Sequence, residues 1–221
     1  VLVTVDGFLD THYVAMLDGH DLPHLEHVVV LRSEPGDVLP EPAERWEAFL
    51  ELGADVDAGA VAERAAALAP DATADLLFTS GTTGKPKGVI CTNGQTLRTV
   101  ATWANVVGLA DTDRYVAVNP FFHSFGYKAG IIAWLVTGGT LLPVPVFDVP
   151  EVMRLIAAER GTMLPGAPTL YQTILNHPDR AALDSSSLRL AVTGAASVPV
   201  SLVEQMRDDL GFDTVITAYG L

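Results

Sequence analysis

Short apolar runs alternate along the chain with longer segments in which apolar residues recur at helical spacing. The apolar runs predict strands at residues 2–5, 27–31, 76–79, 115–118, 140–144, 162–164, 188–193 and 214–217. The segments between them predict helices at residues 44–52, 58–68, 94–107, 151–160, 168–176 and 200–210. Because apolar strands that alternate with helices are typical of sheets buried on both faces, the sequence predicts an α/β fold of stacked, largely parallel sheets with flanking helices.

Some helix ends carry signals of their own. Asp148 can cap the helix at residues 151–160, with Pro150 in its first turn, and Gly161 and Gly211 each come directly after the end of a helix. The stretch 110–113 predicts a join between two lobes, one of residues 1–110 and one of residues 111–221.

An uncharged stretch at residues 129–147 has nearly the length that a membrane-spanning helix needs. Gly138, Gly139, Pro143 and Pro145 interrupt it, however. A buried helix, a glycine turn and a buried strand explain the pattern better, so we expect no membrane span.

Both ends of the chain are apolar. Val1 opens an apolar strand and residues 218–221 end another, whereas natural domain ends are usually polar. These ends predict a piece of a longer protein, and no secretory signal is visible. The single cysteine, Cys91, excludes an internal disulfide and fits a reducing compartment, so we expect a cytoplasmic protein.

Charge is unevenly distributed in this chain of net charge −14. Residues 1–71 contain 15 acidic and 3 basic residues, which indicates solvated acidic faces. Between Asp75 and Asp111 there is no acidic residue, and Lys85, Lys87 and Arg98 give a local positive surplus. The acidic total argues against a nucleic-acid partner, but it leaves room for a small anion near these bases.

The segment with the strongest chemical signal is residues 79–88, of sequence TSGTTGKPKG, between an apolar strand and a helical pattern. Its glycines allow backbone N–H groups to approach an anion, its hydroxyls add donors, and its lysines add charge. It is not a Walker A loop, because Pro86 stands where that motif has its second glycine. The alternative is a flexible turn, but the complete string predicts a polyphosphate-binding loop.

This loop resembles the signature loop of the adenylate-forming superfamily, which includes acyl-CoA synthetases, luciferases and adenylation domains. Further stretches match in the same order: NPFFHSFG at 119–126, TGAA at 193–196 and AYGL at 218–221. The sequences at 121–130, 147–148, 164–166 and 191–196 are similar to those of actinobacterial acyl-CoA synthetases of sterol-ring degradation, which activate a propanoate side chain.

The resemblance implies part of the large N-terminal domain of an ATP-dependent carboxylate–CoA ligase, with the C-terminal domain absent. A carboxylic acid and ATP would form acyl-AMP with Mg²⁺ present, and coenzyme A would then take the acyl group. The alternatives are an adenylation enzyme that loads a carrier-protein thiol and a nucleotide-binding remnant without catalysis.

The resemblance also implies site residues. ATP would be bound by Thr79, Ser80, Gly81, Thr82, Thr83, Gly84, Lys87, Gly194, Ala195, Ala196, Tyr219 and Gly220. The acyl group would be bound by Phe122, His123, Phe125, Tyr127 and Gly194, and the catalytic residues would be His123 and Lys87. No metal ligand is expected within the chain, and Lys87 is favoured over Lys85. Ala218 stands where the family usually has glycine.

Several of these residues have a structural alternative. His123 between aromatic residues is often a packed core histidine, and Phe122, Phe125 and Tyr127 are typical core residues. The spacing of His20, His24 and His27 could hold zinc, but Pro23 interrupts the helix and a solvated turn is favoured. Cys91 is expected to be an inert thiol.

Overall fold

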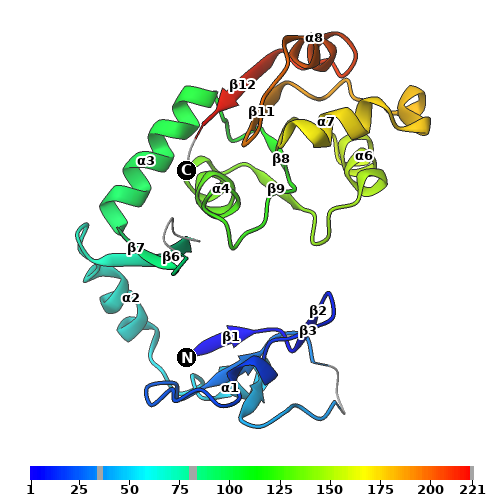
Figure 1. Cartoon of the computed structure of the whole chain (residues 1–221). Helices are drawn as coiled ribbons and strands as arrows, with labels where there is room; N and C mark the ends of the chain where they lie inside the picture. The colour runs from blue at the N-terminus through cyan, green and yellow to red at the C-terminus, as the bar shows by residue number, and fades with distance from the viewer. Residues whose placement is uncertain (34–36, 80–83, 220–221) are drawn as a thin grey trace. The chain divides into compact units, whose positions relative to one another are not determined.

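The chain forms two compact units, Val1–Leu68 and Ala69–Leu221 (Figure 1). The structure is a computed structural model, and it describes residues 1–33, 37–79 and 84–219. The predicted join at 110–113 lies inside the second unit, so the division into two lobes there stays a prediction.

The first unit is built on a small parallel sheet in the order β1-β4-β5. Its elements are β1 (Leu2–Thr4), β2 (Gly7–Phe8), β3 (Thr11–His12), the 3-10 helix η1 (Ala15–Leu17), β4 (Val28–Val30), β5 (Ala43–Arg45), α1 (Trp46–Glu51) and α2 (Ala58–Ala66). Val14, Val28 and Val30 form its core. The predicted helix at 44–52 is therefore shorter, because Ala43–Arg45 pairs with β4 as a strand.

The second unit contains a hairpin, a long helix and a five-stranded sheet. Its elements are β6 (Thr73–Thr79), β7 (Lys87–Thr92), α3 (Asn93–Val107), β8 (Arg114–Ala117), α4 (Ser124–Gly126), the π-helix η2 (Tyr127–Ile132), α5 (Ala133–Thr137), β9 (Thr140–Pro143), α6 (Val149–Ala158), β10 (Met163–Gly166), α7 (Pro168–Leu175), the 3-10 helix η3 (Pro178–Ala182), β11 (Leu190–Gly194), α8 (Val200–Asp208) and β12 (Thr214–Ala218).

The five strands run parallel in the order β12-β11-β10-β8-β9. From β8 the chain moves outward to β9, and it then returns to the other side of β8 and continues through β10, β11 and β12. Because parallel crossovers are right-handed, this reversal puts the connecting helices on opposite faces of the sheet. Helices α6, α7 and α8 cover one face, whereas α3 and the α4–α5 segment cover the other (Figure 1). The predicted α/β fold with largely parallel sheets is confirmed.

The uncharged stretch at 129–147 has the expected order of helix, glycine turn and strand, but the helix is only partly buried, with Leu135 60% exposed. The helical segment from α4 to α5 ends at Gly138, which has a left-handed φ of 80°, and β9 comes next. Within the described part of the chain, no helix is long and apolar enough to cross a membrane. The predicted helix ends are also present: Asp148 Oδ2 accepts from Glu151 N at 3.1 Å, and Gly211 has a φ of 82°.

The sequence prediction was wrong about the element that comes after the phosphate loop. The loop joins β6 to β7, which pair as antiparallel strands, and α3 begins only after β7. Strand β7 escaped prediction because residues 87–90 are exposed and show no apolar alternation that marks a buried face. The loop is therefore the connection of a hairpin, not a turn from a strand into a helix.

A buried carboxylate holds the amino ends of the parallel strands together. Asp113, before β8, is 2% exposed and accepts hydrogen bonds from Arg189 Nε at 2.7 Å, from Thr162 Oγ1 at 2.7 Å and from Ala110 N at 2.8 Å. Burial raises the pKa of Asp113, but the bonds from Arg189, Thr162 and Ala110 outweigh it and hold the pKa below its ordinary value.

This network predicts an acid-sensitive contribution to stability. Because the folded pKa of Asp113 is lowered, the contribution is complete above the unfolded pKa of about 4 and is lost as the pH falls through the folded pKa. Asp113→Asn should lower the free energy of unfolding by about 3 kcal/mol at pH 7 and should flatten its decline in acid. Urea unfolding between pH 3 and pH 7, followed by tryptophan fluorescence, measures both effects. If the free energy of unfolding fell equally in wild type and variant as the pH is lowered, this role of Asp113 would be contradicted.

Candidate functional site

Several of the predicted site residues lie just beyond the carboxyl ends of the parallel strands. Residues 119–123 come after β8, Ala195 and Ala196 after β11, and Tyr219 after β12. The strand order reverses between β8 and β10, and in open α/β sheets ligands bind outside the carboxyl ends at such a reversal. The fold therefore gathers separate sequence motifs at one edge of the sheet.

A cavity of about 230 Å³ lies at this reversal. It is lined by Val118, Asn119, Phe147, Gly166, Ala167, Thr169, Leu170 and Thr173. Asn119 Nδ2 donates to Pro165 O at 3.3 Å and so joins the ends of β8 and β10. Asn119 belongs to the motif at 119–126, but no role was predicted for it.

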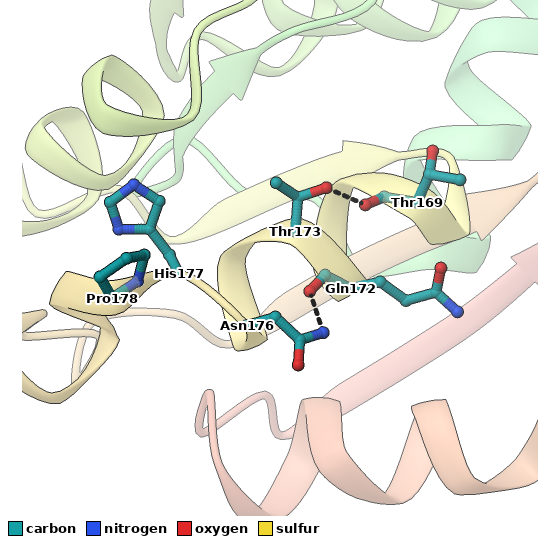
Figure 2. Close-up of a pocket in the computed structure, with 6 residues that line it drawn as sticks. All are labelled: Thr169, Gln172, Thr173, Asn176, His177 and Pro178. Atoms are coloured by element: carbon teal, nitrogen blue, oxygen red, sulfur yellow. Dashed lines mark hydrogen bonds between the residues drawn. The ribbon is translucent and has the colours of Figure 1, made fainter.

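A larger groove, of about 450 Å³, runs along α7 away from this edge (Figure 2). Thr169, Gln172, Thr173, Asn176, His177 and Pro178 line it. Two of its polar side chains bond within the helix: Thr173 Oγ1 donates to Thr169 O at 2.8 Å, and Asn176 Nδ2 donates to Gln172 O at 2.7 Å (Figure 2). Among the described residues, none of the predicted site residues lines either cavity. The smaller cavity contains Asn119 of the motif at 119–126 and lies at the reversal edge, which is therefore the better candidate.

His123 is an exposed helix cap, not a packed core residue. Its Nδ1 accepts a hydrogen bond from Phe125 N at 3.1 Å, at the start of α4. The cap fixes the ring and uses Nδ1, which leaves Nε2 for a ligand at the carboxyl edge of the sheet.

Gly126 makes the turn around His123 possible. A Cβ at this position would lie 2.2 Å from Pro120 O and 2.6 Å from Asn119 O. Only glycine allows the first turn of α4 to pass so close to the chain that leaves β8. This explains why glycine stands three residues after the histidine.

The structure separates the aromatic residues that were predicted to bind the acyl group. Phe122 is 86% exposed, whereas Phe125 is half-buried and packs edge-on against Trp103 at a centroid distance of 6.4 Å. Tyr127 is half-buried at the start of η2. Phe125 thus borders the apolar layer between the sheet and α3, and Phe122 lies on the surface.

The ends of β11 and β12 meet very closely. Gly194 pairs with Ala218, and a Cβ on Gly194 would lie 2.0 Å from Ala218 O. Ala195 then adopts a left-handed φ of 64°, which is unusual for a residue with a side chain. Ala195, Ala196 and Tyr219 are all exposed beside this contact, and Gly220 lies outside the described residues. Small, exposed backbone of this kind is suited to a flat ring.

The predicted phosphate loop is carried by the β6–β7 hairpin. Thr79 and Lys87 are paired across the hairpin, so their side chains lie on the same face, and both are exposed. Gly84 has a left-handed φ of 83°. Ser80, Gly81, Thr82 and Thr83 lie outside the described residues.

An ion pair that the sequence did not predict joins this hairpin to the helical segment after His123. Lys128 Nζ lies 3.3 Å from Asp75 Oδ1 in β6. The sequence held a signal, because Asp75 is the last acid before the acid-free stretch and Lys128 is the only charged residue between Arg114 and Asp148. Nothing in the sequence pairs the two, however.

Among the described residues, no group of three or more His, Cys, Asp or Glu side chains could hold a metal ion. His27, one of the three histidines considered for zinc, instead has its Nδ1 at 2.6 Å from Glu44 Oε1. Cys91 is a free, half-buried thiol.

Comparison with known proteins identifies the family of the chain. Residues 2–221 match the sequence family described as AMP-binding enzyme. A relative from Mycobacterium tuberculosis, 3-[(3aS,4S,7aS)-7a-methyl-1,5-dioxo-octahydro-1H-inden-4-yl]propanoyl:CoA ligase, is 50% identical over 221 residues. The match covers 100% of this chain and 42% of the relative.

Solved structures are also similar. The anthranilate CoA ligase AuaEII in complex with anthranoyl-AMP has a TM-score of 0.74 and 27% identity, over 90% of this chain and 37% of that one. O-succinylbenzoate coenzyme A synthetase (MenE) from Bacillus subtilis, in complex with ATP and magnesium ion, has a TM-score of 0.61 and 32% identity. That match covers 70% of this chain and 31% of MenE.

The fold and the motifs at its carboxyl edge define an α/β domain of the adenylate-forming class. The chain belongs to the AMP-binding enzyme family. It spans less than half the length of the curated relative that it matches.

Proposed function

We propose that this chain is part of an ATP-dependent carboxylate–CoA ligase. A carboxylate oxygen attacks the α-phosphate of ATP, which gives acyl-AMP and releases pyrophosphate; the thiol of coenzyme A then attacks the acyl carbonyl and releases AMP. The observation that carries the proposal is the family match over residues 2–221. In support, the stretches that follow β8, β11 and β12 lie at the carboxyl edge of the sheet, and the phosphate loop belongs to the β6–β7 hairpin.

The first half-reaction brings two anions together, so the site must neutralise charge and align the reactants. We assign the β- and γ-phosphates to the hairpin loop, with Thr79, Gly84 and Lys87 among the described residues. The adenine is assigned to Gly194–Ala196 and Tyr219, where exposed backbone allows a close approach. Mg²⁺ enters with ATP and offsets the charge of the phosphates.

His123 and the aromatic residues beside it are assigned to the acid. Nε2 of His123 faces the carboxylate and the α-phosphate, and it donates a hydrogen bond to the charge that develops there. Phe125 and Tyr127 form the inner wall of the acyl site, and Phe122 covers it from the surface. Because ATP and coenzyme A are cytoplasmic metabolites, the proposal includes a cytoplasmic reaction.

The acid that we propose is a propanoate attached to an indanedione ring, as expected for a steroid-degradation ligase. The support is the name of the Mycobacterium tuberculosis relative at 50% identity, together with the apolar layer around Phe125. A fused ring of this kind needs an apolar wall, whereas its carboxylate must reach the polar edge of the sheet.

The test is carboxylate-dependent ATP–pyrophosphate exchange by the intact protein that contains this chain. A panel would compare the indanedione propanoate with a fatty acid and an aryl acid, and we expect the propanoate to give the highest kcat/KM. Product analysis with coenzyme A and with a carrier-protein thiol then identifies the acceptor. If no acid supports exchange, the ligase proposal fails.

A substitution at His123 separates its capping role from its chemical role. Asn is a good helix cap, so His123→Asn keeps the cap and removes Nε2. Exchange should fall by about 100-fold while the melting temperature stays close to that of the wild type. His123→Ala should lose the cap as well and become less stable by about 1 kcal/mol. Full exchange activity in His123→Asn would reduce the role of His123 to capping.

A further inference from the structure

We propose that Lys128 is a positioning residue, which holds the phosphate-loop hairpin against the helix that begins at His123 through its ion pair with Asp75. The inference rests on the proposed function, because it concerns the alignment of two groups of that site. Neither Lys128 nor Asp75 belongs to the motifs that bind the nucleotide or the acid.

The contact is well buried. The Lys128 side chain is 19% exposed and that of Asp75 is 12% exposed, with 3.3 Å between Nζ and Oδ1. Lys128 Nζ also donates to Thr96 Oγ1 of α3 at 3.3 Å, and Thr96 is 6% exposed. One ammonium group therefore touches β6 and α3 while its backbone belongs to η2.

The buried carboxylate of Asp75 has the ammonium group of Lys128 as its countercharge. Both carboxylate oxygens of Asp75 are buried, and in the described part of the chain neither accepts a hydrogen bond of good geometry. Lys128 is therefore the charge that offsets this carboxylate. Burial lowers the pKa of Lys128, but its contacts with Cys91 and Asp75 outweigh this and keep the pKa above its ordinary value. Lys128 is thus charged throughout the neutral pH range.

Asp75 lies on the same face of the hairpin as Thr79 and Lys87, two residues of the phosphate loop. Asp75 pairs with Cys91, and Thr79 pairs with Lys87, with two-residue alternation between them. The side chains of all four therefore lie on one face of the hairpin. On the opposite face, Phe78 and Ile90 are 75% and 64% exposed. Lys128 consequently contacts the face of the hairpin that carries the Thr79 and Lys87 side chains.

The geometry explains why this contact controls alignment. The base of the hairpin is fixed to α3, since Asn93 N donates to Ala72 O at 3.0 Å and Gly94 N donates to Pro70 O at 2.7 Å. From Asp75 to Thr79 the strand extends about 13 Å toward the loop. A small tilt at Asp75 is therefore enlarged at Thr79 and Lys87. Lys128 lies on the helical segment that His123 caps, so the ion pair sets Thr79 and Lys87 relative to His123.

The test uses Asp75→Val with Lys128→Met in the intact protein, because this double variant removes both charges and leaves no buried ion without a partner. We expect kcat of ATP–pyrophosphate exchange to fall by about tenfold or more, with KM for ATP changed by less than about threefold. Lys128→Arg should restore most of the rate. The matched control is Glu151→Gln with Arg154→Met, which removes an exposed ion pair of 2.7 Å in α6 and should leave exchange unchanged.

A near-isosteric variant, Thr96→Val, gives a milder test that does not threaten folding. It removes only the hydroxyl that contacts Lys128, and we expect a loss of about two- to fivefold in kcat. Wild-type kcat in both the double variant and Thr96→Val would overturn the inference.

Hydrogen exchange gives a readout that does not require activity. In the double variant, amides of β6, β7 and residues 123–132 should exchange faster than in the wild type, whereas those of β10 and β11 should not change. Unchanged protection in the hairpin would overturn the inference. If the wild type catalyses no ATP–pyrophosphate exchange with any acid, the proposed ligase function fails. Amide hydrogen exchange then still decides the role of the ion pair.

Discussion

Replacing Lys87 with alanine should lower kcat/KM for ATP in pyrophosphate exchange by about 100- to 1000-fold, the usual effect of removing one donor from a developing charge. Lys87 opens β7 opposite Thr79, so the hairpin fixes the backbone from which its ammonium group reaches the loop. Its side chain is exposed, and the substitution should change the free energy of unfolding by no more than about 0.5 kcal/mol. The loss should therefore be one of rate, not of folding.

The matched control is Lys85→Ala, which removes the same charge two residues earlier in an exposed position. A screened surface charge should matter little, so exchange should stay within about threefold of the wild type. Thermal unfolding of both variants checks that each is folded. Equal activities of Lys87→Ala and Lys85→Ala would remove Lys87 from the phosphate site.

The parallel sheet could be predicted because strands that are buried on both faces have nearly continuous apolar sequences. Strands such as Leu190–Gly194 are uncharged and almost entirely buried, and the helices between them repeat apolar residues at helical spacing. Strand β7 had no such pattern, since its first four residues are exposed and its place is set by pairing with β6. The strands β2 and β3 have two residues each and depend on their partner in the same way.

Within the candidate site, the motifs could be found from the sequence, but their geometry could not. The string at 119–126 marked His123, yet only the structure shows that Nδ1 caps α4 and that Gly126 passes close to Pro120 O. The pairing of Asp75 with Lys128 depends on how η2 packs on the hairpin, and no local pattern encodes that contact. Local chemistry was therefore visible in the sequence, whereas contacts between distant segments required the fold.

Gly194 should be the least replaceable residue on the adenine side. A Cβ there would lie 2.0 Å from Ala218 O, a backbone atom that cannot rotate away. Gly194→Ala must therefore separate the ends of β11 and β12, which displaces Ala195, Ala196 and Tyr219 together. Overpacking of this kind costs about 1–3 kcal/mol, and the larger effect should fall on nucleotide binding.

Because adenine contacts are made equally in the ground state and in the transition state, Gly194→Ala should raise KM for ATP by about tenfold or more and change kcat less. Kinetics of ATP–pyrophosphate exchange and urea unfolding of the same preparation measure the two effects. Gly130→Ala is the control, since its Cβ would meet nothing closer than 3.8 Å and a helical alanine should leave the free energy of unfolding equal or up to about 1 kcal/mol higher. A wild-type KM for ATP in Gly194→Ala would show that the adenine lies elsewhere, because the contact between β11 and β12 cannot survive this substitution unchanged.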